Sequence, residues 1–238
     1  MTLARKLDAL ARELKRESSA TDKLFRLAQK TVRTLGLDPA VSIERCMLVE
    51  LQRTPTTTRG LSDLVIRRAT DGDIPALVKL DNRDAALFRT RFDRGDLVYL
   101  GQLDQDVVCA TCFHRGPTPF DEERARIAVW RVGDASTFWS YDAMAPVEMR
   151  SAGVVAKLFQ VALREIFEVH GGQLVRGFIH DWNHPSLMLH QRLGFATSGR
   201  ATAVAFPGFK WLRWESDGRT RQWLLPRDSD FALPPAES

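Results

Sequence analysis

Titratable side chains gather at the ends of two neighbouring predicted strands. Tyr141 and Asp142 lie in a strand predicted over 137–145, and His180 and Asp181 end the next predicted strand. Ligands of open α/β sheets bind beside such strand ends, where phenol, carboxylate and imidazole groups can transfer protons. Because side chains alternate along a strand, we expect Tyr141 and Asp142 on opposite faces, so that at most one enters a site. A structural or solvated role is the alternative for each of these residues.

The turn after the 137–145 strand could bind phosphate through its main chain. It reads APVEMRSAG over 145–153 and leads into a helix predicted over 154–170. Amides that open a helix point outward, and the helix dipole favours an anion there. An ordinary strand-to-helix turn is the alternative interpretation.

A second strand-to-helix transition carries capping residues. After the strand predicted over 173–180, the side-chain oxygens of Asn183 and Ser186 can accept hydrogen bonds from amides at a helix start. Gly194 then stops the helix, and Phe195 opens another apolar run. The predicted order is strand, capped helix, glycine stop and strand.

This second transition resembles motif B of the GNAT (Gcn5-related N-acetyltransferase) superfamily, whose pattern is roughly Asn-x-x-Ala/Ser-x-x-Leu-Tyr-x-Lys-x-Gly-Phe. The residues in register are Asn183, Ser186, Leu189, Arg192 in place of lysine, Gly194 and Phe195. His190 stands where most members have tyrosine. The phosphinothricin-acetyltransferase-like branch often has histidine there, in Ser-x-x-Leu-His-x-Lys-Leu-Gly-Phe, so the chain also resembles that branch.

The first turn resembles motif A of the same superfamily, Arg/Gln-x-x-Gly-x-Gly/Ala, which cradles the coenzyme A pyrophosphate. Arg150 and Gly153 match, while Val155 replaces the final small residue. The resemblance implies that acetyl-CoA or another acyl-CoA is the co-substrate, with no metal. It implies these coenzyme-binding residues: Met144, Ala145, Arg150, Ser151, Ala152, Gly153, Val154, Val155, Asn183, Ser186 and His190.

The chemistry implied by the resemblance is direct attack of an amine on the thioester. Met144 or Ala145 would supply an amide for the developing oxyanion, and His190 would protonate the leaving sulfur. An imidazole with an ordinary pKa of about 6.5 is partly protonated at neutral pH. Packing of His190 against the coenzyme is the alternative. Tyr141 and Asp142 are the candidate general bases, and a chain of water molecules would serve equally well.

The acceptor predicted by this interpretation is a small-molecule amine, such as an amino sugar or an amino acid. A protein or peptide amine is the alternative among enzymes. The departures at Val155 and His190 keep open another class, a non-catalytic CoA-binding sensor or partner module on the same fold.

The order of predicted elements indicates an α/β protein with the GNAT fold, in which helices cover both faces of a mixed, mostly antiparallel sheet. This domain is expected over 61–226, after an N-terminal helical extension and linker over 1–60 and before a loosely ordered tail over 227–238. The extension is expected to pack on the domain or on a second copy, giving a homodimer. A helix lying on a membrane surface is the alternative.

Composition is that of a globular protein: 238 residues are 44% hydrophobic and 27% charged, with a formal net charge of +4. This balance is too weak to indicate nucleic-acid binding. The charged N-terminus lacks a signal-peptide core, no run spans a membrane, and the 3 cysteines suit the cytoplasm. Cys109 and Cys112 fall within one strand, so we expect buried cysteines on opposite faces instead of a redox or zinc site. Ser216-Asp217-Gly218 predicts a late hairpin.

Overall fold

The computed structural model describes residues 20–34, 36, 41–55, 63–117, 120–122, 127–129, 133–149 and 153–226. The chain forms two compact units. The larger unit contains Cys46–Arg200 and the turn Glu215–Arg219, and the smaller unit contains the chain up to Arg45 with Ala201–Trp214 and Thr220–Ser229. The division falls within four strands, so β1, β9, β10 and β11 each contribute residues to both units.

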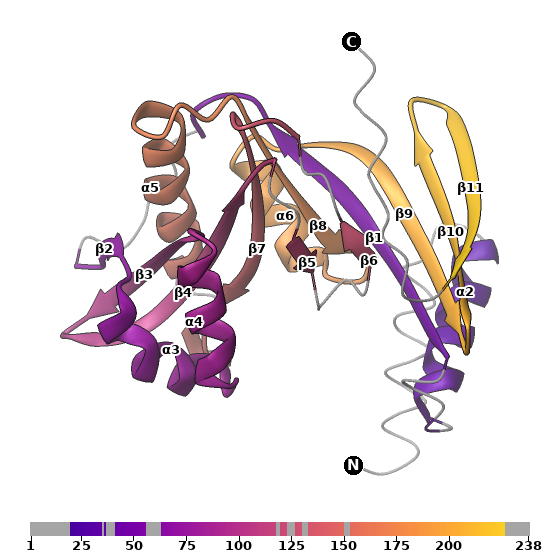
Figure 1. The fold of residues 1–238 in the computed structure, drawn as a ribbon, viewed down its shortest axis with the longest axis horizontal. Helices are drawn as coiled ribbons and strands as arrows, with labels where there is room; N and C mark the ends of the chain where they lie inside the picture. The colour runs from indigo at the N-terminus through magenta and orange to yellow at the C-terminus, as the bar shows by residue number, and fades with distance from the viewer. Residues whose placement is uncertain are drawn as a thin grey trace. The chain divides into compact units, whose positions relative to one another are not determined.

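The larger unit is built on a mixed sheet (Figure 1). Its strands lie in the order β1 (Ser42–Leu51), β8 (Leu174–His180), β7 (Thr137–Met144), β4 (Asp106–Arg115), β3 (Leu97–Leu103) and β2 (Val65–Arg68). Strands β7 and β8 are parallel, and the other neighbouring pairs of this unit are antiparallel. The prediction of a mixed, mostly antiparallel sheet is therefore confirmed.

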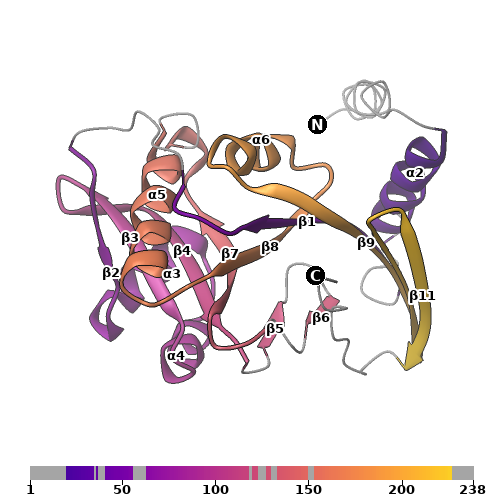
Figure 2. The same cartoon turned by 90° about the horizontal axis from the view of Figure 1, so that it is seen from above.

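Helices cover both faces of this sheet. Helix α5 (Val154–Glu168) packs across β3 and β4, as Figure 2 shows, and α3 (Ile74–Asp81) packs on β4 beside α4 (Ala85–Asp93). Two cysteines of β4 lie on opposite faces of the sheet. The Sγ atom of Cys109 lies 3.9 Å from the carbonyl oxygen of Val154 in α5, whereas that of Cys112 lies 3.7 Å from Nη1 of Arg91 in α4. Their predicted opposite orientation is confirmed, and both are buried.

The core between α5 and the sheet follows from the helical period of α5. Its fully buried side chains are Val154, Leu158, Phe159, Ala162, Leu163 and Ile166. Each large aliphatic group removed from water contributes about 1.5–3 kcal/mol. The helix predicted over 154–170 ends at Glu168, and the next residue, Val169, is exposed. Short 3-10 turns precede α3 (η1, Asp71–Asp73) and follow β7 (η2, Val147–Met149).

Strand β1 places part of the predicted extension inside the sheet. Cys46 pairs with His180 and Leu51 with Val175, so residues 46–51 form an integral strand of the larger unit. The local pattern of residues 46–52 is typical of either a strand or a short helix. The sequence does not separate the two, because strand pairing across such a distance has no local signal. Residues 1–19, most of the 54–60 linker and the 227–238 tail lie outside the described residues.

The smaller unit contains α2 (Ala20–Thr34), and its chain continues through β9 (Ala196–Phe206), β10 (Phe209–Ser216) and β11 (Arg219–Pro226). Gln29 is buried, and its Nε2 donates to the carbonyl oxygen of Ile43 at 2.8 Å. Two apolar residues of α2, Leu24 and Leu27, are 68% and 46% exposed. The homodimer expected through the N-terminal extension remains a prediction.

The remaining strands form a late hairpin and a short separate pair. The hairpin between β10 and β11 is confirmed, because Asp217 and Gly218 adopt the positive φ of a tight hairpin turn. The segment after residue 115 contains β5 (Phe120–Glu122), which pairs with β6 (Ile127–Val129). Within the described ranges, no helix is both long and apolar enough to cross a membrane.

Candidate acyl-transfer site

The two parallel strands at the centre of the larger unit stop pairing partway along their length. Registered pairs between β7 and β8 end at Trp139 and Arg176. Gly177 follows, and a Cβ atom added there would lie 2.9 Å from the carbonyl oxygen of Ser140. Beyond this point a cavity of about 350 Å³ lies between the strand ends.

The cavity is lined from both faces of the sheet. Its walls are formed by Cys46, Ser140, Tyr141, Asp142, Ala143, Phe159, Gly177, Phe178, Ile179, His180, Trp182, Asn183, Ser186 and His190. Phe159 belongs to α5, and Ser186 and His190 belong to α6 (His184–Arg192), on one side. Asp142 contacts Arg91 of α4 on the other. Because consecutive residues of β7 and β8 line the cavity, it borders both faces of the sheet.

Helix α6 is built as its sequence predicts. The Oδ1 atom of Asn183, the N-cap residue, accepts a hydrogen bond from the amide of Ser186 at 3.3 Å. Gly194 ends the helix with a φ of +95°. The amide of Phe195 then donates to the carbonyl oxygen of His190 at 2.9 Å. These local contacts fix the wall that carries His190.

His190 is a neutral imidazole in this wall. Its ring lies between the rings of Phe159 and Phe195, with centroids at 5.0 and 4.9 Å. Nδ1 lies 2.8 Å from the carbonyl oxygen of Ser186, so it carries the proton and donates it. Burial lowers the pKa of His190 to about 4, although the Ser186 carbonyl acts in the opposite direction. The expectation of a partly protonated imidazole is therefore wrong, because the aromatic surroundings disfavour the charged form.

The opposite wall is held by buried ion pairs. The Asp142 carboxylate accepts hydrogen bonds from Arg83 at 2.7 and 3.0 Å and also pairs with Arg91. The Arg91 and Asp142 side chains are only 5% and 4% exposed. Arg83 also pairs with Asp81 at 2.6 Å. Asp142 is thus a compensated buried charge.

Tyr141 belongs to an adjoining polar cluster. Its hydroxyl donates to Asp96, which also pairs with Arg94 and lies 2.7 Å from Nδ1 of His114. Burial tends to raise the pKa of the Asp96 carboxyl, but hydrogen bonds from His114, Arg94 and Tyr141 outweigh it and lower that pKa. Burial, together with nearby negative charge, raises the pKa of Tyr141 well above its ordinary value. The phenol therefore stays protonated.

A bulge in β7 brings Tyr141 and Asp142 into contact with the same residue, Arg91. The pairing with β4 shifts register between Ala110 and Cys112, and Asp142 adopts a φ of +51°. The Arg91 guanidinium lies 4.9 Å from the centroid of the Tyr141 ring while it pairs with Asp142. The prediction that alternation places these side chains on opposite faces is therefore wrong, because the extra residue of a bulge interrupts the alternation.

The predicted site residues separate into three groups. Tyr141, Asp142, Asn183, Ser186 and His190 line the cavity together. Met144, Ala145, Gly153, Val154 and Val155 are not among the described residues that line it. Arg150, Ser151 and Ala152 lie outside the described residues.

Cavity residues missed by the sequence analysis come mainly from distant segments. Cys46 belongs to β1, and Phe159 lies one turn into the buried face of α5. Trp182 stacks on His180 with ring centroids 5.2 Å apart. His180 had been noted as a strand-end residue, and its neighbour Trp182 could have been found from the same position. Cys46 carried no signal, because its place opposite His180 depends on the β1–β8 register.

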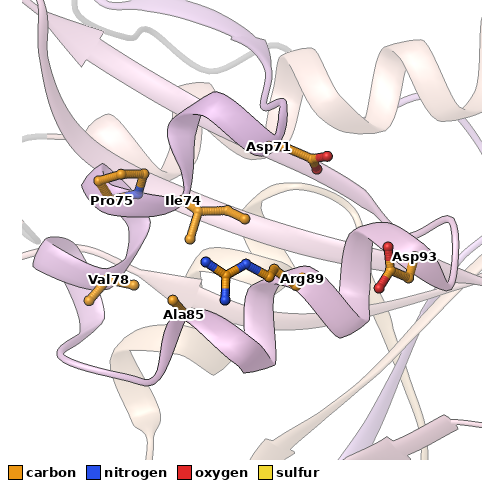
Figure 3. Close-up of a pocket in the computed structure, with 7 residues that line it drawn as sticks. All are labelled: Asp71, Ile74, Pro75, Val78, Ala85, Arg89 and Asp93. Atoms are coloured by element: carbon orange, nitrogen blue, oxygen red, sulfur yellow. The ribbon is translucent and has the colours of Figure 1, made fainter.

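A second hollow of about 600 Å³ lies between α3 and α4. Figure 3 shows Arg89 between Ile74 and Ala85, with Asp71 and Asp93 toward one end. Pro75 and Val78 complete its lining. This hollow contains none of the predicted site residues. Among the described residues, no cluster of histidine, cysteine, aspartate and glutamate could hold a metal ion.

Comparison with solved structures identifies the fold. A protein from Novosphingobium aromaticivorans assigned to the GNAT acetyltransferase family has a TM-score of 0.51 at 13% identity, covering 70% of this chain and 66% of that one. A GCN5-related N-acetyltransferase from Kribbella flavida has a TM-score of 0.51 at 15% identity, covering 74% and 64%. The chain thus spans less than two thirds of the length of either structure.

The chain has the fold of the GNAT acetyltransferases, as the resemblance of its motifs predicted. No protein-family model matches the sequence. No curated protein matches it either.

Proposed function

We propose that the protein is an acyl-CoA-dependent N-acyltransferase that transfers an acetyl or related acyl group to an amine. The observation that carries this proposal is the cavity where β7 and β8 part, which is lined from both faces of the sheet. Such an opening allows a thioester to enter from one face and an amine from the other. The GNAT fold supports the same assignment.

The side formed by α5 and α6 is the proposed carrier side. Helix α5 begins after Gly153, which has a φ of +76° and provides no side-chain cap. Its first amides are therefore available to a pyrophosphate, and Arg150, Ser151 and Ala152 would complete that turn. Met144 and Ala145 remain predicted contacts of the coenzyme. Asn183 and Ser186 shape the wall along which the pantetheine arm would lie.

His190 would contribute through packing and through Nε2. Because Nδ1 carries the proton, the Nε2 lone pair can accept a hydrogen bond from the carrier. A neutral imidazole with this hydrogen bond has no second proton for a leaving thiolate. We therefore assign His190 to carrier binding, which is the packing role foreseen as the alternative.

The side formed by β7, β8 and β1 is the proposed acceptor side. Asp142 and Ala143 together oppose a single residue of β4 in the bulge, so an amide there is not held by a regular ladder. We propose that this amide, instead of that of Met144 or Ala145, binds the developing oxyanion. Asp142 is ion-paired and Tyr141 is protonated, so both hold the bulge in position. His180 is then the proposed base for the amine proton.

A small-molecule amine, such as an amino acid or an amino sugar, is the proposed acceptor. A cavity of about 350 Å³ lies at the small end of ligand sites. The stacked rings of His180 and Trp182 offer a flat wall for a compact acceptor. A peptide amine would need further surface, so a panel of amino acids, amino sugars and short peptides separates the two acceptor classes.

Two measurements test the function. Acetyl-CoA at about 100 times its Kd should stabilise the folded protein by about 2.7 kcal/mol, measured as an increase in Tm. Release of free CoA thiol with the amine panel then reports transfer. Binding without release for any amine would favour a CoA-binding sensor, and the absence of binding would contradict both functions.

A further inference from the structure

A thiol and an imidazole face each other across two strands of the cavity. Cys46 of β1 is the registered partner of His180 in β8. The Sγ atom of Cys46 lies 3.5 Å from Nδ1 of His180, within hydrogen-bond distance for sulfur. A nucleophile beside a base that can take its proton is the arrangement found in thiol-based acyl transfer.

A third side chain orients the base. Trp182 stacks on His180 with an interplanar angle of 17°, so the plane of the imidazole is fixed while Nδ1 is directed at Cys46. All three residues line the cavity of the proposed acyl transfer. The pair therefore lies in the cavity that we propose to hold the thioester.

The other cysteines provide an internal contrast. Burial raises the pKa of both the Cys109 and the Cys112 thiols to about 12. Neither is among the described residues that line the cavity. The Sγ atom of Cys109 contacts the carbonyl oxygen of Val154, and that of Cys112 contacts the Arg91 guanidinium. None of the three described cysteines forms a disulfide.

We propose that Cys46 is an acyl acceptor within the site, and that acyl-CoA acylates it when no amine is bound. This inference rests on the proposed function, because it requires the thioester to bind in the cavity. His180 takes the thiol proton, and the Cys46 sulfur attacks the carbonyl carbon. A new sulfur–carbon bond forms while the bond to the CoA sulfur breaks. The leaving thiolate then takes the proton from His180, giving free CoA and an acyl-cysteine.

Enclosure would preserve this acyl-cysteine. Cys46 has no exposed surface, so bulk water reaches the new thioester only through the cavity. An amine that enters later can attack the same carbonyl, form its amide and restore the thiol, with His180 again moving the proton. The acyl group is thus retained on the acceptor side between binding events.

The probe for this inference is acetyl-CoA without amine. We expect intact-protein mass spectrometry to show one added acetyl group, peptide mapping to place it on Cys46, and neutral hydroxylamine to remove it. Isotopically labelled free CoA should also exchange into acetyl-CoA under these conditions. Cys46→Ala should lose both signals, with Cys46→Ser as a second variant if the alanine protein does not fold. His180→Gln should slow labelling at neutral pH by roughly 10²-fold.

Cys109→Ala is the matched control and should retain the label and the exchange. Acetyl-CoA binding is measured in parallel by the increase in Tm. If acetyl-CoA binds but neither label nor exchange is seen, acylation of Cys46 is refuted while the proposed function stands. If acetyl-CoA does not bind, the proposed function fails as well.

Discussion

The two sides of the cavity are stabilised by opposite means. On the α5–α6 side, His190 is neutral and packed between aromatic rings, and its Nδ1 donates a hydrogen bond to the main chain. On the α3–α4 side, Asp142 is held between two guanidinium groups. A carrier with an apolar arm suits the first wall. The second wall must hold an irregular strand in place, and strong charge pairs do so.

The difference shows that a polar residue at a site is not thereby a proton-transfer group. His190 and Asp142 were both candidate catalytic residues, and each is constrained in a different way. Burial keeps the imidazole uncharged, whereas two guanidinium groups engage the carboxylate. The proposed proton-transfer group is instead His180, which lines the cavity at the end of β8.

Removing the carboxylate of Asp142 should lower the free energy of unfolding more than any other change. Asp142→Asn keeps the shape of the side chain, and asparagine tolerates the left-handed backbone at this position. It leaves the buried Arg91 without its carboxylate, so we expect a loss of about 3–5 kcal/mol in the free energy of unfolding. Urea denaturation measures this change.

The control for that variant is Asp81→Asn. It removes the more exposed partner of Arg83 and should cost no more than about 1 kcal/mol. Equal losses for the two variants would show that the buried pair has no special role in holding β7.

The contribution of His190 to the free energy of unfolding should depend on pH. His190 is neutral in the folded state down to a pKa of about 4, whereas the unfolded chain takes up this proton near pH 6.5. Its contribution is therefore complete above about pH 6.5 and is lost as the pH falls toward 4, by roughly 3 kcal/mol in total. His190→Phe should remove this acid sensitivity, as measured by urea unfolding at several pH values.

A matched variant separates this effect from other acid effects. His184→Gln, at the exposed first residue of α6, should keep the acid loss of the unmodified protein. If the loss between pH 6.5 and 4 persists in His190→Phe, the neutral imidazole is not its source. Turnover that is unchanged across pH in His190→Phe would agree with a binding role.

The two walls also differ in how far the sequence predicted them. The α6 wall follows from neighbouring residues: Asn183 caps, Gly194 stops, and the pattern of α6 needs no distant partner. The other wall depends on contacts between Asp142 and arginines more than fifty residues away in sequence, as well as on a bulge that alternation cannot foresee. The position of Cys46 depends on a strand pairing from the far end of the chain. Local capping was therefore predictable, and non-local pairing was not.

The spacing between β7 and β8 can be tested at Gly177. An added Cβ would lie 2.9 Å from the backbone oxygen of Ser140, so Gly177→Ala must push β7 and β8 apart. We expect a loss of about 1–3 kcal/mol in stability and weaker acetyl-CoA binding. Gly72→Ala, whose nearest contact would be an ordinary 3.6 Å, should change stability by less than about 0.5 kcal/mol. Normal binding in a destabilised Gly177→Ala protein would show that the strand separation does not shape the carrier side.

The smallest loss of stability is expected when a helix cap is removed. The caps of α6 and α4 can be compared directly. Asn183→Ala removes the cap of α6, and Asp84→Ala removes the cap of α4, whose Oδ1 accepts from the Ala86 amide at 2.9 Å. Each should cost about 1 kcal/mol by urea denaturation. Asn183 lines the cavity and Asp84 does not, so only Asn183→Ala should also raise the Kd for acetyl-CoA. If both variants bind acetyl-CoA equally well, the α6 wall contributes stability alone, and the carrier side must be sought elsewhere.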